Sequence, residues 1–501
     1  MASNTSDPTQ LPLASILVAR FLRSNNYTET LDAFIREAGL PRNVGQVNSK
    51  TEGVDGWTIE SVIEEKKAFD QTANFERYGD EDAREKRDWW SSPAPSKPAT
   101  IHTPSSSNLL SVSVQPWERQ SGGEAGTDAA LKSTYIIATG ADRRLNLFKT
   151  SPDHEAAASF SGLTDSPILS HVTIRGGTYQ LATSMSGQLL LLRDSEVLHR
   201  RKDHTKYVVQ VTAHEQPDSN SVWVATAGWD GRILIYSLDL EHDAGNTAAP
   251  LTIGEPRARI QLPTNPESII FVRHTETGEL ILLASRRDST YLYYYEVSSE
   301  PSSTAGEESN KPYEPRLLGK QNLAPHSNAW VAFSPSYLAL SPHDPGLLAV
   351  ATSTLPHMKV MIVRLLFPSP DGSSTGDPSE ATPAEPETQA TQAMAALALQ
   401  NREDAAIMIQ ANTLAPQTAY STPQVVWRPD GSGLWVNGDD GVIRGIEAKT
   451  GKIVAQLKDG HEVGSKIRSI WAGWVDVDGK EEKEEWVVSG GFDKRLIVWK
   501  V

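Results

Sequence analysis

The sequence predicts an all-β repeat fold, a seven-bladed β-propeller, preceded by a small α-helical module. From about residue 99 onward, apolar residues alternate with period two in short runs that Gly, Asp and Asn turns separate. Several of these runs pair into units of one shape, repeated at spacings typical of propeller blades. Residues 11–41 instead place their apolar side chains at helical spacing, so this segment is predicted to form a separate helical element.

The composition limits the functions that the chain can have. Its 501 residues carry a formal net charge of −16, which disfavours binding to nucleic acid or to an anionic membrane surface. The absence of cysteine excludes disulfides, thiolate catalysis and cysteine-ligated zinc. No apolar run is long enough to span a membrane, and residues 1–10 form a polar, disordered tail rather than a signal peptide. We therefore expect a protein of the cytoplasm, the nucleus or both.

Two apolar stripes in residues 11–41 predict a pair of helices separated by a break at residues 24–26. Thr28 is the expected N-cap of the second helix, and Gly39 its expected end. Helices this short cannot bury their stripes alone, so a second copy of the chain is the simplest partner. The candidate dimerisation residues are Ile16, Leu17, Phe21, Leu22, Tyr27, Leu31 and Phe34.

These apolar residues and their spacing resemble the lissencephaly-type homology (LisH) motif. The resemblance implies a helix pair that dimerises as a four-helix bundle. Asn26 stands where the family often has Gly, and Asn is the residue next best suited to a left-handed turn. Residues 42–90 follow as a charged helical connector; its pattern favours a solvated helix over the alternative, the further helical module (CTLH) of many LisH proteins. Residues 91–98 are predicted to be a Pro/Ser linker.

Three units within residues 99–501 share one pattern: a strand, a tight turn with Asp, and a second strand that ends on an aromatic residue. Their turn residues are Asp142, Asp230 and Asp493. Weaker matches place further turns at Ser186, Asp288, His357 and Asp440, so seven blades are expected, with six or eight as alternatives. The spacing from Asp142 to Ser186 and from Ser186 to Asp230 is 44 residues in both cases, one blade length. Longer spacings later coincide with polar insertions at 300–315, 368–400 and 476–485.

These units resemble WD repeats. The resemblance implies that the turn Asp of a blade accepts hydrogen bonds in its turn and from a histidine of a Gly-His pair, which ties the blade together. One blade has all four residues of this structural set: His461, Ser489, Asp493 and Trp499. Another has His204, Thr226 and Asp230, with Tyr236 in place of Trp, while Asp142 and Asp440 are the turn residues of further blades.

Two segments outside the repeats have expected roles. Residues 99–103 are predicted to supply the outer strand of the last blade and so close the ring. Residues 391–400 are rich in Ala, Leu and Met and are predicted to form a helix. That helix either packs against the side of its own propeller or docks into a partner.

No catalytic or metal-binding arrangement emerges from the sequence: it has no phosphate-binding loop, no nucleophile motif and no paired histidines. We expect no catalytic residue, metal, cofactor or small-molecule substrate. In propellers, the residue before the turn Asp faces the rim of the central channel. The rim residues of types enriched at interaction hot spots are Met185, Trp229, Arg287 and Phe492, and Ala141, Pro356 and Asp439 complete the rim. Packing of Trp229 and Phe492 on neighbouring loops is the alternative; the acidic composition favours a basic or aliphatic peptide.

The preferred interpretation is a non-catalytic, homodimerising scaffold whose propeller binds peptide segments of partner proteins. By resemblance, LisH–propeller proteins serve in ubiquitin-ligase assemblies, transcriptional corepressor complexes and motor regulation; the first two types are favoured here. One alternative is a propeller hydrolase that uses carboxylates in its channel. Another is a purely structural subunit of a large complex.

Overall fold

The computed structural model describes residues 13–45, 58–60, 62–63, 77, 89–119, 131–217, 220–240, 251–297, 312–326, 333–368, 389–477 and 483–501. The chain divides into two compact units, residues 1–76 and residues 77–501. The predicted tail at 1–10, most of the connector and the centres of the three predicted insertions lie outside the described residues.

The first unit contains two helices, α1 (Leu13–Ser24) and α2 (Thr28–Glu37). Asn26 joins them with a φ of 58°, the left-handed conformation expected from the sequence. Ala19, Leu31 and Val44 form the small buried core, against which Ile16, Leu22, Phe34, Ile35 and Leu40 pack. The loop after α2 therefore closes back over α1.

The ends of α2 differ in one respect from the sequence-based prediction. Tyr27 occupies the N-cap position and makes no side-chain cap hydrogen bond, while Thr28 is already the first helical residue. At the other end, Gly39 has a φ of 64°, which permits the chain to reverse as predicted. Gly45 packs so closely on α1 that a Cβ atom there would lie 2.7 Å from the backbone nitrogen of Arg20.

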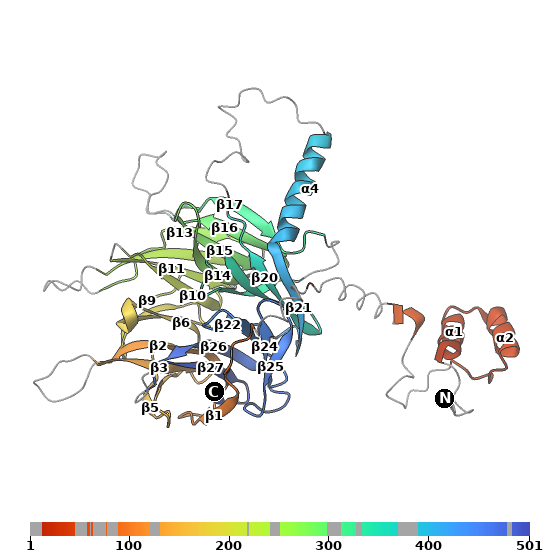
Figure 1. Ribbon diagram of the computed structural model, residues 1–501, viewed down its shortest axis with the longest axis horizontal. Helices are drawn as coiled ribbons and strands as arrows, with labels where there is room; N and C mark the ends of the chain where they lie inside the picture. Colours follow the sequence, from red (N-terminus) through yellow and green to blue (C-terminus); the bar gives the residue numbers. More distant parts are fainter. Residues whose placement is uncertain are drawn as a thin grey trace, which may run out of the picture. The chain divides into compact units, whose positions relative to one another are not determined.

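The second unit is a seven-bladed β-propeller, as predicted (Figure 1): among its described residues, seven antiparallel sheets have four strands each. Blade 1 contains β2 (Leu109–Arg119), β3 (Leu131–Gly140), β4 (Leu145–Lys149) and β5 (Ala156–Phe160). Blade 2 contains β6 (Ile168–Ile174), β7 (Tyr179–Ser184), β8 (Leu189–Arg193) and β9 (Glu196–Arg201), with a 3-10 turn at Arg175–Gly177. Blade 3 contains β10 (Val208–Glu215), β11 (Ser221–Gly228), β12 (Arg232–Asp239) and β13 (Ala258–Gln261). Blade 4 contains β14 (Pro266–Arg273), β15 (Leu280–Arg286), β16 (Tyr291–Glu296) and β17 (Leu317–Asn322).

The remaining blades come from the last third of the chain and from one early strand. Blade 5 contains β18 (Pro335–Leu340), β19 (Leu347–Thr352), β20 (His357–Arg364) and β21 (Ile407–Pro416). Blade 6 contains β22 (Val425–Trp427), β23 (Gly433–Val436), β24 (Ile443–Glu447) and β25 (Ile453–Leu457). Blade 7 contains β26 (Ile467–Val475), β27 (Glu484–Gly491), β28 (Leu496–Lys500) and β1 (Lys97–Ile101).

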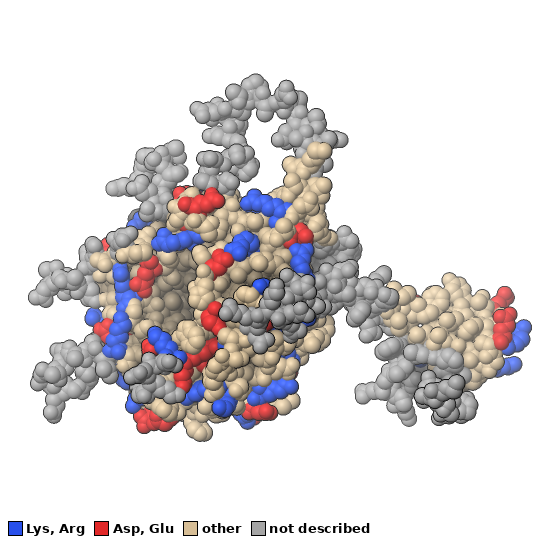
Figure 2. All heavy atoms as spheres, viewed as in Figure 1, with Lys and Arg blue, Asp and Glu red and all other residues tan. Residues whose placement is uncertain are grey.

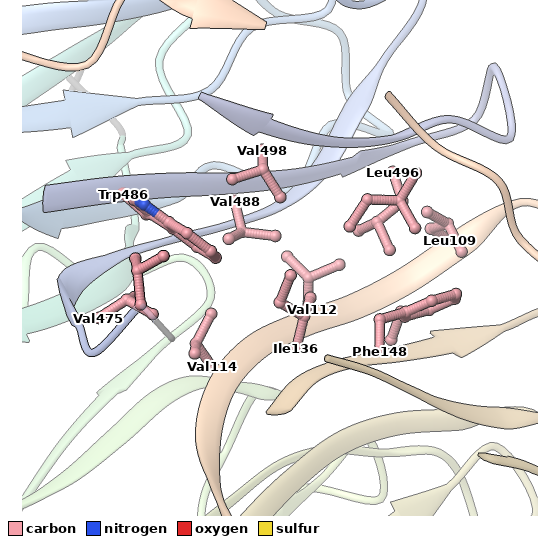
Figure 3. Close-up of a cluster of buried hydrophobic side chains, with 13 residues drawn as sticks. Leu109, Val112, Val114, Ile136, Phe148, Val475, Trp486, Val488, Leu496 and Val498 are labelled. Atoms are coloured by element: carbon pink, nitrogen blue, oxygen red, sulfur yellow. The ribbon is translucent and has the colours of Figure 1, made fainter. Parts of the chain in front are cut away.

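The ring closes through β1, which pairs antiparallel with β28 from Lys97 opposite Lys500 to Ile101 opposite Leu496. The closing strand thus begins two residues before the predicted segment. The inner strand β2 of blade 1 lies beside β26 and β27 of blade 7 (Figure 1). A buried apolar cluster that includes Leu109, Phe148, Trp486 and Val498 fills this joint (Figure 3). Similar clusters join blades 1 and 2, 2 and 3, 3 and 4, 5 and 6, and 6 and 7.

Blade 5 departs from the sequence-based prediction in two ways. His357 is the first residue of β20 and not a turn residue. The turn residue lies three positions earlier, at Thr354, and the preceding Ser353 donates its backbone N–H to the Ser334 carbonyl. In addition, helix α4 (Gln389–Ala406) is longer than predicted and runs directly into β21.

Residues 90–91, where the predicted connector meets the predicted linker, are docked on blade 6. The Trp90 ring meets Trp435 edge to face at 5.1 Å, and the Arg428 guanidinium carbon lies 4.3 Å from its centroid. A Cβ atom on Gly433 would lie 2.4 Å from the Trp90 ring, so the absence of a side chain there makes room for the indole. Arg428 is itself fully buried and paired with Glu485 at 2.5 Å.

Replacing Trp90 by Ala should destabilise the propeller by about 3 kcal/mol, because it empties a site that the neighbouring backbone shapes around the indole. Trp89→Ala is the matched control. Trp89 is 42% exposed and contacts Lys449 across its ring face, an interaction worth below about 1 kcal/mol at the surface. Urea unfolding of the two variants measures the difference. Equal losses of stability would contradict the proposed docking.

Candidate functional site

A Ser-His-Asp chain of hydrogen bonds lies inside blade 7. His461 Nδ1 lies 2.9 Å from Asp493 Oδ2, and His461 Nε2 lies 2.8 Å from Ser489 Oγ. Trp499 Nε1 donates to the same Ser489 oxygen at 2.9 Å. Because the carboxylate can only accept, Nδ1 carries the proton and Nε2 accepts from the serine hydroxyl.

This geometry matches that of a catalytic triad, but its surroundings indicate a structural role. We call such a hydrogen-bonded set, which holds the turn of a blade in place, a clasp. His461 is 4% exposed, and Ser489 and Trp499 are fully buried. The serine oxygen is already held by Trp499, and no substrate atom could reach it without opening the blade. Asp493 also accepts the backbone N–H groups of Glu462 and Arg495, so it ties the loop before the blade to the turn.

Blade 3 repeats the clasp with one substitution. His204 bridges Asp230 at 3.0 Å and Thr226 at 2.9 Å, whereas Tyr236 turns its hydroxyl to Asp203 at 3.0 Å. Burial alone would raise the pKa of Asp230, but hydrogen bonds from His204 and the backbone N–H of Thr205 lower it to about 2.

Other blades keep a turn clasp with different chemistry. In blade 1, Ser105 takes the place of the histidine and donates to Asp142. In blade 6, Arg444 donates to Asp440 at 2.6 Å. Blade 2 reverses the roles, since its turn residue Ser186 donates to Asp165 at 2.6 Å.

The rim residues follow the turns around one end of the propeller. Trp229 packs on Tyr207 with ring centroids 5.7 Å apart and ring planes tilted by 33°, and the Arg287 guanidinium lies 5.4 Å from the centre of the Trp229 ring. Arg287 is in turn held by Glu267 at 2.7 Å. Figure 2 shows acidic and basic side chains interspersed on the visible face of residues 77–501 rather than gathered in one patch.

The structure does not bring all four predicted rim residues together. Trp229 and Arg287 line the central channel, while Met185 and Phe492 lie in the corresponding turns outside its lining. The Phe492 ring is 39% exposed. The predicted rim position Pro356 is wrong, because the misplaced turn of blade 5 puts Ser353 there.

Sequence reasoning missed Tyr207 and the channel-lining Tyr420, which is 89% exposed. Trp229 donates its backbone N–H to the carbonyl of Tyr207, the residue directly before the inner strand β10. The residue that precedes each inner strand is therefore a further rim position that could have been located from the sequence.

The central channel is a cavity of about 780 Å³ lined by the inner strands of the blades. In six blades the inner strand shifts register across its second residue, which then lies in the channel lining: Leu110, Leu169, Val209, Glu267, Ser336 and Arg468. His171 also lines it, between the hydroxyls of Ser111 and Ser113. Burial lowers the pKa of His171 to about 4, so this imidazole is neutral at physiological pH. Within the described ranges, no three metal-ligating side chains lie close together.

Part of helix α4 packs against the propeller, one of the two alternatives that the sequence left open for this helix. Its C-terminal half docks on the propeller, where Gln400 donates to the Pro325 carbonyl at 2.6 Å and Glu403 accepts the Asn322 N–H at 2.7 Å. Met394, Leu397 and Leu399, nearer its start, are 74%, 55% and 53% exposed. Among the helices that the structure describes, none is both long and apolar enough to cross a membrane.

Two family models match the chain. The model of the LisH domain of the family UCP007778 matches residues 14–42, and that of the β-propeller domain of the same family matches residues 313–500. No curated protein matches in a comparison of sequences. The fold and these matches define the class: the chain is a LisH-plus-propeller protein. Proteins of this architecture are typically non-catalytic interaction modules.

We expect Asp230→Asn to lower the free energy of unfolding by roughly 2 kcal/mol at pH 7, from the difference between a folded pKa of about 2 and the ordinary 3.8. Because the folded pKa is depressed, this stabilisation is present above about pH 4 and is lost as the pH falls toward 2. Urea unfolding from pH 7 to 2.5 should show the two proteins converging. Asp288→Asn is the matched control, since the exposed Asp288 in blade 4 has no histidine partner among the described side chains. A constant difference for Asp230→Asn would contradict the assignment.

Proposed function

We propose that this protein is a non-catalytic, homodimerising scaffold whose propeller rim binds peptide segments of partner proteins. The observation that carries the proposal is the half-exposed aromatic cluster of Trp229 and Tyr207 with Arg287 at the mouth of the channel. Trp, Tyr and Arg are the residue types most enriched at interaction hot spots. Arg287 already covers part of the Trp229 ring, so a basic peptide would have to displace it.

The hydrolase alternative has less support. It requires an accessible acid and base that face each other in the channel, whereas the Ser-His-Asp arrangement is sealed inside blade 7 and His171 is neutral between two serines. Of the two carboxylates that line the channel, Glu267 is paired with Arg287 at 2.7 Å and Asp288 lies exposed in the turn at the mouth. Asp439, the one carboxylate expected on the rim, is paired with Lys466 at 2.9 Å.

Removing the Trp229 ring should lower partner recovery on the order of tenfold, the loss typical of a hot-spot aromatic. The measurement is quantitative mass spectrometry of proteins that co-purify with full-length protein and with Trp229→Ala. Trp474→Ala is the control, because Trp474 is 50% exposed but lies at the far end of inner strand β26 from the rim. Unchanged recovery with Trp229→Ala, or an equal loss with Trp474→Ala, would sink the rim assignment.

The proposed dimer face is narrower than the seven residues that the sequence suggested. Leu31 is 6% exposed inside the helix pair, and Ile16, Leu22 and Phe34 pack around it. Leu17, Phe21 and Tyr27 lie outside this core; Tyr27 is 52% exposed, and its ring lies 6.3 Å from that of Phe21. These three residues are the best candidates for contact with a second copy, which would make the scaffold bivalent.

Leu17→Glu combined with Phe21→Glu should convert the dimer into a monomer, because it places two carboxylates on the proposed contact face without entering the core of the helix pair. Light scattering measures the mass of the full chain. The control is Glu29→Lys, an exposed charge change on α2. A wild-type mass of one chain, or an unchanged mass for the double variant, would rule out this dimer.

The proposal also specifies the type of complex to which the scaffold belongs. A ubiquitin-ligase or chromatin/corepressor assembly is favoured by resemblance to other LisH–propeller proteins. The same co-purification experiment tests it, because ligase components or chromatin subunits should be among the proteins that Trp229→Ala loses.

A further inference from the structure

The central channel contains hydrogen-bond donors that neither the fold nor the proposed rim uses. Side chains of the inner strands bind the backbone of the next blade. Gln115, Gln210 and Gln424 accept through their amide oxygens the N–H groups of Thr173, Ile269 and Ile470, at 3.1, 2.9 and 2.8 Å. Each glutamine therefore turns its NH₂ group away from that joint. All three line the channel, and none of these NH₂ groups has an acceptor among the described residues.

Arg468 is the most unusual residue of this lining. It lies at the register shift of β26 and reaches the channel from blade 7. No carboxylate in the described part of the chain is within ion-pair distance of its guanidinium. Burial lowers the pKa of Arg468 to about 10, and nearby Tyr337 of blade 5 acts in the opposite direction, so the guanidinium remains charged at pH 7. Arg468 is partly buried at the channel wall, and a partly desolvated guanidinium without a counter-charge is stabilised when an anion joins it.

The carboxylates of the channel lining come from a different blade than Arg468. Glu267 and Asp288 both belong to blade 4. Glu267 is paired with Arg287 at 2.7 Å, and Asp288 is exposed in the turn at the mouth. Neither contacts Arg468. Gln424 is bonded to Ile470 of β26, the strand that carries Arg468, so the lining offers a guanidinium, the Tyr337 phenol and an amide donor, groups that bind phosphate oxygens.

We propose that the channel binds a phosphate group through Arg468, with the Tyr337 hydroxyl and the Gln424 amide as further donors. The cavity of about 780 Å³ is large enough for such a group. The anion could be free in solution or part of a partner's phosphorylated side chain, and both sources present the same chemistry. This site lies within the channel and stands even if the rim proposal fails.

The test is calorimetric titration of the full-length protein, in phosphate-free buffer at fixed ionic strength, with three probes. These are inorganic phosphate, a phosphoserine peptide and its unphosphorylated counterpart. Saturable binding of inorganic phosphate identifies a free anion as sufficient. Binding of the phosphopeptide alone identifies a partner side chain as the source. No saturable binding of phosphate or phosphopeptide, or equal binding of the two peptides, overturns the proposal.

Two variants connect the binding to the channel. Arg468→Met should weaken the bound probe at least tenfold, and Tyr337→Phe should weaken it a few-fold. Lys458→Met is the control, because Lys458 is exposed and its loss removes the same charge. Without anion, Arg468→Met should melt at or above the wild-type temperature, since it removes a partly desolvated charge that has no ion-pair partner among the described residues. Unchanged binding, or a marked loss of stability in Arg468→Met, would show that Arg468 has a structural role instead.

Discussion

The joint between blades 1 and 7 is the contact on which the rest of the structure depends. A four-stranded blade has two apolar faces, so it is stable only between two neighbours, and a row of blades would leave both end faces exposed. Pairing β1 with β28 joins an early strand to the last blade, and the cluster around Leu109 and Trp486 seals the two faces. Every other contact between blades presupposes this closure.

Hydrogen bonds around the channel complete the same ring. Ser469 accepts the Val112 N–H across the closing joint, and Ser170 accepts the Val211 N–H between blades 2 and 3. At the equivalent position of blade 5 stands Tyr337, for whose hydroxyl no hydrogen bond to a described residue is seen. Blades 5 and 6 are joined instead by Trp427, whose ring N–H bonds the Ala339 carbonyl at 2.9 Å.

The sequence predicted those parts of the fold in which a particular residue type has one structural role. A local pattern in the single sequence was enough to locate three features: the turn aspartates with their histidines, Asn26 between the helices, and the closing strand. The turn of blade 5 was misplaced because it uses Thr354, bonded to the His357 carbonyl, at the position where most of the other blades have Asp. The docking of Trp90 was missed because the glycines that receive it, Gly433 and Gly445, lie more than 340 residues away in the sequence. The channel lining could not be predicted, since a register shift at the second residue of an inner strand leaves no mark in the period-two pattern.

The same register shifts explain why the charge of the whole chain is a poor guide to the channel. A net charge of −16 describes the averaged surface and favours a basic ligand. The inner strands, however, must satisfy the backbone of their neighbours with acceptors such as the glutamine oxygens, and this requirement leaves the donor ends of those side chains facing the cavity. With Glu267 held by Arg287, two charges of the described lining have no ion-pair partner: Arg468 inside the channel and the exposed Asp288 at its mouth. The constraint that builds the ring thus also places hydrogen-bond donors along its centre, which the net charge of the whole chain does not reveal.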